Sequence, residues 1–79
     1  MALELPRRTT LALAVFDISG RRIRELAGPA LFDAGSHTLR WDGRDAAGTR
    51  VPPGLYLLKL TAETDNRDFA ATRVLSVAY

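Results

Sequence analysis

A turn-rich segment of sixteen residues, 41–56 (WDGRDAAGTRVPPGLY), constrains the fold of this chain more than any other part of its sequence. Its aspartates can accept hydrogen bonds from nearby backbone amides, and its glycines allow the positive φ values that tight turns need. Pro52 and Pro53 lack backbone N–H donors, so a central strand cannot pass through them. We therefore predict a corner between two β-strands here, not an active site.

Apolar residues alternate with polar ones on both sides of this segment, which is the pattern of half-buried strands. We expect one strand over residues 36–42 and another over residues 55–64. The alternation turns Trp41 and Tyr56 toward the interior, which favours core packing over carbohydrate stacking. Tyr56 also stands where the tyrosine of a tyrosine corner offers its hydroxyl to a nearby backbone group.

The N-terminal half predicts a central strand followed by an irregular one. Residues 9–18 are apolar on both faces, as in a strand with neighbours on either side. After the turn at Ser19-Gly20, residues 22–26 should pair back as a hairpin, with a bulge where the alternation breaks. We expect Gly28-Pro29 to end this strand and residues 30–35 to form a loop.

The C-terminal segment predicts a second hairpin. Its tip is expected at residues 65–68, and its last strand over residues 69–78. Arg73 falls on the apolar side of that strand, so it should lie near an edge or extend its charged end outward to solvent.

Together these segments predict an all-β protein, a small Ig-like or fibronectin-like antiparallel β-sandwich of about seven strands. The length of 79 residues suits one domain, and 47% hydrophobic against 25% charged residues is a globular composition. Residues 1–79 are expected to form that domain, with residues 1–8 as an N-terminal arm or first strand. The expected structural core is Leu13, Val15, Leu39, Trp41, Tyr56, Leu58 and Leu60.

The N-terminal residues Ala2, Leu3, Glu4 and Leu5 alternate like a short strand and precede Pro6. They could form the first strand of their own sandwich or add to the exposed edge of a neighbouring copy. Head-to-tail exchange of this arm would build a polymer or another homo-oligomer.

Charge and hydropathy argue against nucleic acid and membrane-spanning functions. Eleven basic residues against nine acidic ones leave a net charge of only +2, with the two signs interspersed. No apolar run approaches the roughly 18 residues that cross a bilayer. Arg7-Arg8 and the apolar residues after them superficially resemble a twin-arginine signal, but Asp17 interrupts that run, so we predict an ordinary strand.

The sequence favours no catalytic site and no cofactor. There is no cysteine, and the single histidine, His37, lacks partners for a zinc site or a triad. Asp33, Asp42 and Asp45 suggest calcium, yet the twelfth position counted from Asp42 is Pro53, where an EF-hand requires glutamate. Calcium or glycan binding at these loops remains an alternative function.

Four segments in order give this chain its resemblance to a known family. They are VFDISGR at 15–21, GSHTLRWDGRD at 35–45, PGLY at 53–56 and Thr72-Arg73 in the final strand. The chain resembles the Ig-like domain of bacterial flagellar hook-capping proteins and the related C-terminal modules of secreted bacterial proteins, some of which are similar to type IX sorting domains. It departs from the sorting domains by lacking a basic tail at Tyr79.

The resemblance implies a non-catalytic scaffold or a C-terminal, secretion-associated module of an extracellular or surface protein. Its partners would be other domains of a parent chain, neighbouring copies or secretion machinery. We expect either an excised module or a small stand-alone protein. The alternative is a self-assembling subunit of an extracellular appendage or hook-cap-like structure, joined by strand addition.

Overall fold

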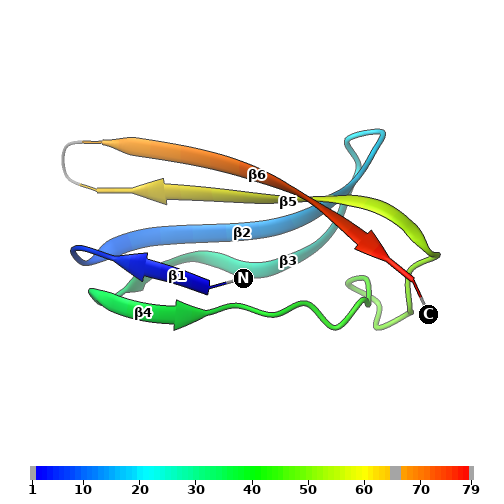
Figure 1. Ribbon diagram of the computed structural model, residues 1–79, viewed down its shortest axis with the longest axis horizontal. Coiled ribbons are helices and arrows are strands. Elements are labelled where there is room, and N and C mark those ends of the chain that lie inside the picture. Colours follow the sequence, from blue (N-terminus) through cyan, green and yellow to red (C-terminus); the bar gives the residue numbers. More distant parts are fainter. Residues whose placement is uncertain (1, 65–66, 79) are drawn as a thin grey trace.

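A computed structural model describes residues 2–64 and 67–78, which form a two-layered antiparallel β-sandwich (Figure 1). The large sheet has the strand order β3-β2-β5-β6, and the small sheet pairs β1 with β4. The strands are β1 (Ala2–Leu5), β2 (Thr9–Asp17), β3 (Arg22–Phe32), β4 (Gly35–Thr38), β5 (Gly54–Glu63) and β6 (Asp68–Val77). The predicted all-β sandwich is confirmed, with six strands in the described residues where about seven were expected.

β2 is central, as its apolar faces indicate. It pairs with β3 on one side and with β5 on the other, both antiparallel. Its inward residues Leu11, Leu13 and Val15 are the largest fully buried side chains among those described. Alternation along β5 places Tyr56 and Leu58 against them.

β3 is longer than the sequence suggested, and the loop expected over residues 30–35 is wrong except at residues 33 and 34, because β3 extends to Phe32 and β4 begins at Gly35. The strand continues through Gly28 and Pro29 to Phe32. Three register irregularities interrupt its pairing with β2, in agreement with the expected bulge. β3 is an edge strand, where proline is tolerated because no further strand needs its missing N–H donor.

β4 is shorter than the strand predicted over residues 36–42. It ends at Thr38, where its pairing with Ala2 of β1 ends. The chain then runs irregularly to β5, interrupted only by an isolated bridge between Arg44 and Arg50 in the described chain. Leu39 and Trp41 are still half-buried against the core although they lie outside a strand.

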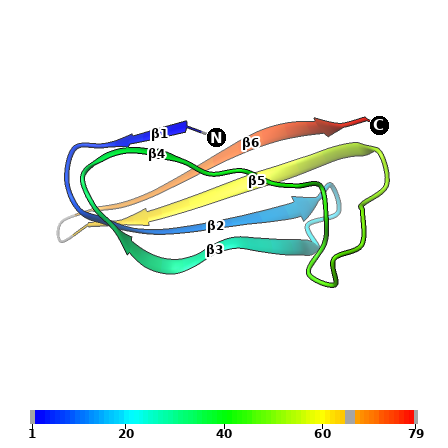
Figure 2. The ribbon, with the colours of Figure 1, turned by 90° about the horizontal axis from the view of Figure 1, so that it is seen from below.

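The small sheet covers only part of the large one. Figure 2 shows β1 and β4 as one layer, with β6 rising along its length toward that layer. β6 forms the other edge of the large sheet and agrees with the strand predicted over residues 69–78. Of the hairpin tip expected before β6, residues 65 and 66 lie outside the described residues.

Within the described ranges there is no helix long and apolar enough to span a membrane.

Candidate functional site

The corner over residues 41–53 is held by side chains that bond to its own backbone. One carboxylate oxygen of Asp42 accepts hydrogen bonds from the Arg44 amide at 3.0 Å and from the Arg24 guanidinium at 2.6 Å. The indole N–H of Trp41 donates to the Arg44 carbonyl at 2.9 Å. Asp42 thus ties the corner to β3 through an ion pair and closes a turn at the same time.

A second turn follows within the same corner. The carboxylate of Asp45 accepts hydrogen bonds from the amides of Ala47 and Thr49, both at 2.9 Å. Gly48 has a φ of +83°, a conformation that favours glycine. Beyond the turn, Val51 is buried, and its amide donates to the Gly43 carbonyl at 2.9 Å. The polar residues of this segment therefore stabilise its shape, as the turn-rich composition predicts.

Tyr56 anchors the end of the corner. Its hydroxyl donates to the Pro52 carbonyl at 2.5 Å, which is the hydrogen bond expected of a tyrosine corner. Its ring meets Trp41 edge to face, with centroids 5.4 Å apart and planes at 66°. This geometry turns both aromatic rings toward each other and the core.

Replacing Tyr56 by phenylalanine should lower the free energy of unfolding by about 1 kcal/mol. The substitution keeps the buried ring and removes only the hydroxyl that satisfies the Pro52 carbonyl. Chemical denaturation of both proteins measures this difference. Equal midpoints and slopes would show that the hydrogen bond contributes nothing to stability.

The three candidate calcium ligands do not come together. Asp33 lies near Arg8 at 3.3 Å, whereas Asp42 and Asp45 are engaged in the corner. Within residues 2–64 and 67–78, no group of three or more His, Cys, Asp or Glu side chains could hold a metal ion. Their positions give each carboxylate a structural hydrogen bond or ion pair in place of a shared ligand site.

His37 lies on β4 and has local partners. Its Nε2 is 2.6 Å from the Asp33 carbonyl, and its ring packs edge to face on Phe32 with centroids 5.3 Å apart. Phe32 is the last residue of β3, and Asp33 lies in the short segment that joins β3 to β4. This histidine therefore fixes the connection between the two sheets.

Asp17 closes the tight turn between β2 and β3. Its carboxylate accepts hydrogen bonds from the Ser19 hydroxyl at 2.7 Å, the Arg21 amide at 2.9 Å and the Ser19 amide at 3.0 Å. The Ser19 hydroxyl has the largest effect, followed by the Arg21 amide, and together these bonds lower the pKa of Asp17 below its usual value of 3.8. Gly20 completes the turn with a φ of +91°.

Because folding lowers the pKa of Asp17, the ionised carboxylate contributes stability above about pH 4. That contribution is lost as the pH falls through the lowered pKa. Thermal melts from pH 7 to pH 2 should therefore show a smaller acid-induced fall in Tm for Asp17→Asn than for the unmodified protein. Asp68→Asn, at the start of β6, is the matched control. Parallel curves for the unmodified protein and Asp17→Asn would contradict the prediction.

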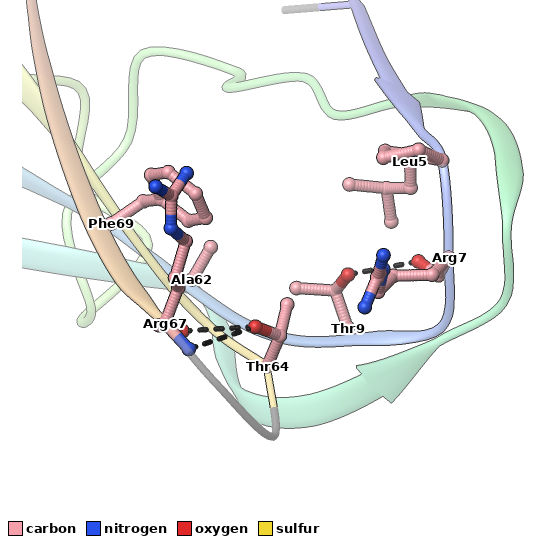
Figure 3. A pocket seen from close by; sticks show the side chains of 8 residues that line it. Leu5, Arg7, Thr9, Ala62, Thr64, Arg67 and Phe69 are labelled. Carbon is pink, nitrogen blue, oxygen red and sulfur yellow. Dashed lines mark hydrogen bonds between the residues drawn. The ribbon is translucent and has the colours of Figure 1, made fainter.

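Two clefts lie on the inner face of the large sheet. The first, of about 540 Å³, has Leu5, Arg7 and Thr9 on one side and Ala62, Arg67 and Phe69 on the other (Figure 3). The second, of about 550 Å³, lies between Trp41 and the end of β6 near Leu75. The sequence did not predict the clefts, because they depend on how far the small sheet extends over the large one.

The N-terminal arm forms β1. Ala2, Leu3, Glu4 and Leu5 pair with β4 of the same chain, in register Ala2 to Thr38. β1 pairs with no other described strand, so its second edge is free. Leu5 also lines the first cleft. The arm borders the first cleft, and the second cleft lies farther along β6, so we treat the three as one candidate interaction surface.

Comparison with known proteins agrees with this geometry. A family model described as the FlgD Ig-like domain matches residues 2–66, including the whole corner. The basal-body rod modification proteins FlgD of Salmonella typhimurium and Salmonella typhi are each 39% identical to this chain over 57 residues, which cover 72% of this chain. The crystal structure of FLGD from P. aeruginosa superposes with a TM-score of 0.68 at 26% identity, covering 95% of this chain and 57% of that one.

The sandwich and its corner define a structural, non-catalytic Ig-like module. The chain belongs to the FlgD Ig-like domain family, the family of flagellar hook-capping proteins that its sequence resembles. It spans only 24% of the length of each curated relative.

Proposed function

We propose that this chain is a structural interaction module of an extracellular or surface-exposed bacterial protein. It would serve as a scaffold in a hook-cap-like assembly or as a C-terminal, secretion-associated domain. One observation carries the proposal: the carboxylates of Asp17, Asp42 and Asp45 are hydrogen-bonded within turns, whereas one edge each of β1, β3, β4 and β6 has no strand partner among the described residues. Such edges offer backbone groups to another polypeptide.

Cell fractionation tests the location that this proposal requires. Protease added to intact cells should degrade the protein on the surface, or the protein should be recovered from the medium. A cytoplasmic protein of known location serves as the control for lysis. Complete protection in intact cells, with recovery in the cytoplasmic fraction, would contradict the proposal.

Assembly by exchange of the arm is a second candidate, favoured by the pairing of β1. Its only strand partner in the described chain is β4, and exposed residues Pro6, Arg7 and Arg8 link it to β2. A swapped β1 could make the same pairing with β4 of a neighbouring copy. Light scattering should then give a mass that rises with concentration, and deletion of residues 1–6 should abolish the rise. A monomer at every concentration would exclude arm exchange.

A further inference from the structure

The first half of the inner face of β6, from Phe69 to Arg73, is exposed although its sequence alternates like a buried strand, whereas Leu75 and Val77 farther along are partly buried against the core. Phe69, Ala71 and Arg73 lie on the same side as the inner residues of β5, with which they pair directly. Tyr56, Leu58 and Ala62 of β5 are buried, yet Phe69 is 52% exposed. The segment after β4, through Leu39, Trp41 and Val51, thus covers the core of β2 and β5 but leaves the first half of β6 exposed.

The two clefts lie along the inner face of β6, the first beside its exposed half and the second beside its partly buried half. The first lies beside Phe69 at one end of β6, and the second beside Leu75 nearer its other end. Six residues of extended chain separate these positions, a span of roughly 20 Å. An occupant that filled both clefts would therefore be an extended segment of about seven residues.

The lining of both clefts carries only positive charge. Arg7 and Arg67 line the first cleft, and Arg40 and Arg73 line the second. No acidic side chain of the described residues lines either cleft. The ion pairs within the described chain use other arginines, namely Arg8, Arg22 and Arg24. An occupant that complements this surface therefore carries negatively charged groups beside its apolar ones.

The backbone indicates that the occupant is a polypeptide. Alternate residues of β1 direct their N–H and C=O groups away from β4, because each strand of an antiparallel pair uses one edge for that pairing. In Figure 3, the end of β1 at Leu5 borders the first cleft opposite Phe69. A strand lying between β1 and β6 could pair with the free edge of β1 while its side chains entered the clefts. An acyl chain would fill the clefts without using these backbone groups.

We propose that the inner face of β6 is a docking site for an extended partner segment in which apolar residues alternate with acidic ones. Its apolar side chains fill the clefts beside Phe69 and Leu75, and its acidic side chains, which alternate onto the opposite face of the added strand, meet arginine side chains that extend past the rim. Strand addition to β1 then completes the small sheet over β6. The proposal rests on the proposed interaction function and names the chemistry of its partner.

Binding can be followed through Trp41, which is the single tryptophan of the chain and lines the second cleft. The probe is a capped seven-residue peptide that alternates valine and glutamate, and the matched control alternates valine and lysine. Titration with the glutamate peptide should shift the Trp41 emission saturably to shorter wavelength, because the occupant displaces water from the indole. The lysine peptide should produce no saturable shift.

Two pairs of variants locate the site. Ala71→Phe should block the groove and abolish binding, whereas Ala70→Phe, on the outer face of the same strand, should bind normally. Arg73→Glu should weaken binding about five-fold, the equivalent of one exposed ion pair. Lys59→Glu makes the same charge change on the outer face of β5 and should leave affinity unchanged. Thermal melts verify that each variant is folded.

Several results would overturn the proposal. The first is the absence of a saturable shift with the glutamate peptide. The others are equal binding of both peptides and equal binding by Ala71→Phe and Ala70→Phe. Saturable binding of dodecanoate without binding of the glutamate peptide would identify an acyl-chain site instead. Failure here leaves the proposed extracellular role intact, because fractionation tests that role separately.

Discussion

Replacing Leu13 by alanine is expected to lower the free energy of unfolding by about 3 kcal/mol. Leu13 is 1% exposed on the central strand β2 and packs in the core with Val15, Val51 and Tyr56. Its truncation removes apolar contacts and leaves a cavity that the strands on either side cannot close. A domain of this size has a total stability on the order of 4–12 kcal/mol, so the loss is a large fraction.

Thermal denaturation should show this loss as a fall in Tm of roughly 12–24 °C. Leu55→Ala is the matched control, because Leu55 also lies in the large sheet but is 54% exposed. We expect its Tm to fall by only a few degrees. Similar effects of the two substitutions would contradict the position of the core.

Replacing Trp41 by alanine should also lower the free energy of unfolding by about 3 kcal/mol, at the lower end for a large aromatic residue because the side chain is only half-buried. The substitution removes the contact with Tyr56 and the hydrogen bond from the indole to the Arg44 carbonyl. An edge-to-face aromatic pair contributes about 1 kcal/mol beyond its buried area. Urea denaturation followed by circular dichroism measures the change without relying on Trp41 fluorescence.

Trp41→Phe separates the two contributions. Phenylalanine retains a ring beside Tyr56 but has no N–H donor for the Arg44 carbonyl. We expect a loss of about 1 kcal/mol for this variant. Negligible effects of both substitutions would mean that Trp41 does not anchor the corner.

The docking proposal and the stability predictions test different properties of the same sheet, although Leu13 and Trp41 also line the second cleft. Leu13 lies on the buried part of its inner face, whereas Ala71 lies on the exposed part. A destabilised Leu13→Ala protein and a folded Ala71→Phe protein that no longer binds would therefore separate the core from the interaction surface. This division is consistent with a structural module whose function lies at its uncovered strands.

Local sequence signals identified most elements of this fold. Alternation along residues 55–64 and 69–78 predicted β5 and β6, and the apolar faces of residues 9–18 predicted a central strand. The expected end of the strand at Gly28-Pro29 was wrong, because β3 is an edge strand and can contain proline, and the sequence does not show which strands lie at an edge. It also extended the strand beginning at residue 36 too far, because the alternation persists beyond the pairing with β1.

Val51 is the core residue that sequence patterns missed. It stands among turn formers, without the alternation that marks an inward position, yet it is only 5% exposed. Its burial follows from the path of the corner, which the hydrogen bond from the Val51 amide to the Gly43 carbonyl and the packing of Tyr56 determine together. Leu11 and Ala62 are buried as well, on strands whose inward faces the sequence did identify.

The sequence by itself determined the class of fold, the corner and the family, because alternation, turn chemistry and motif order are local properties. Only the tertiary structure decided which of the apolar positions are covered. Tyr56 and Phe69 both lie on inward faces of adjacent strands, but the first is buried and the second is half exposed. The physical reason is the path of the segment after β4, since Trp41 and Val51 of that segment pack in the core with Tyr56, and the core cluster of the described residues does not extend to Phe69.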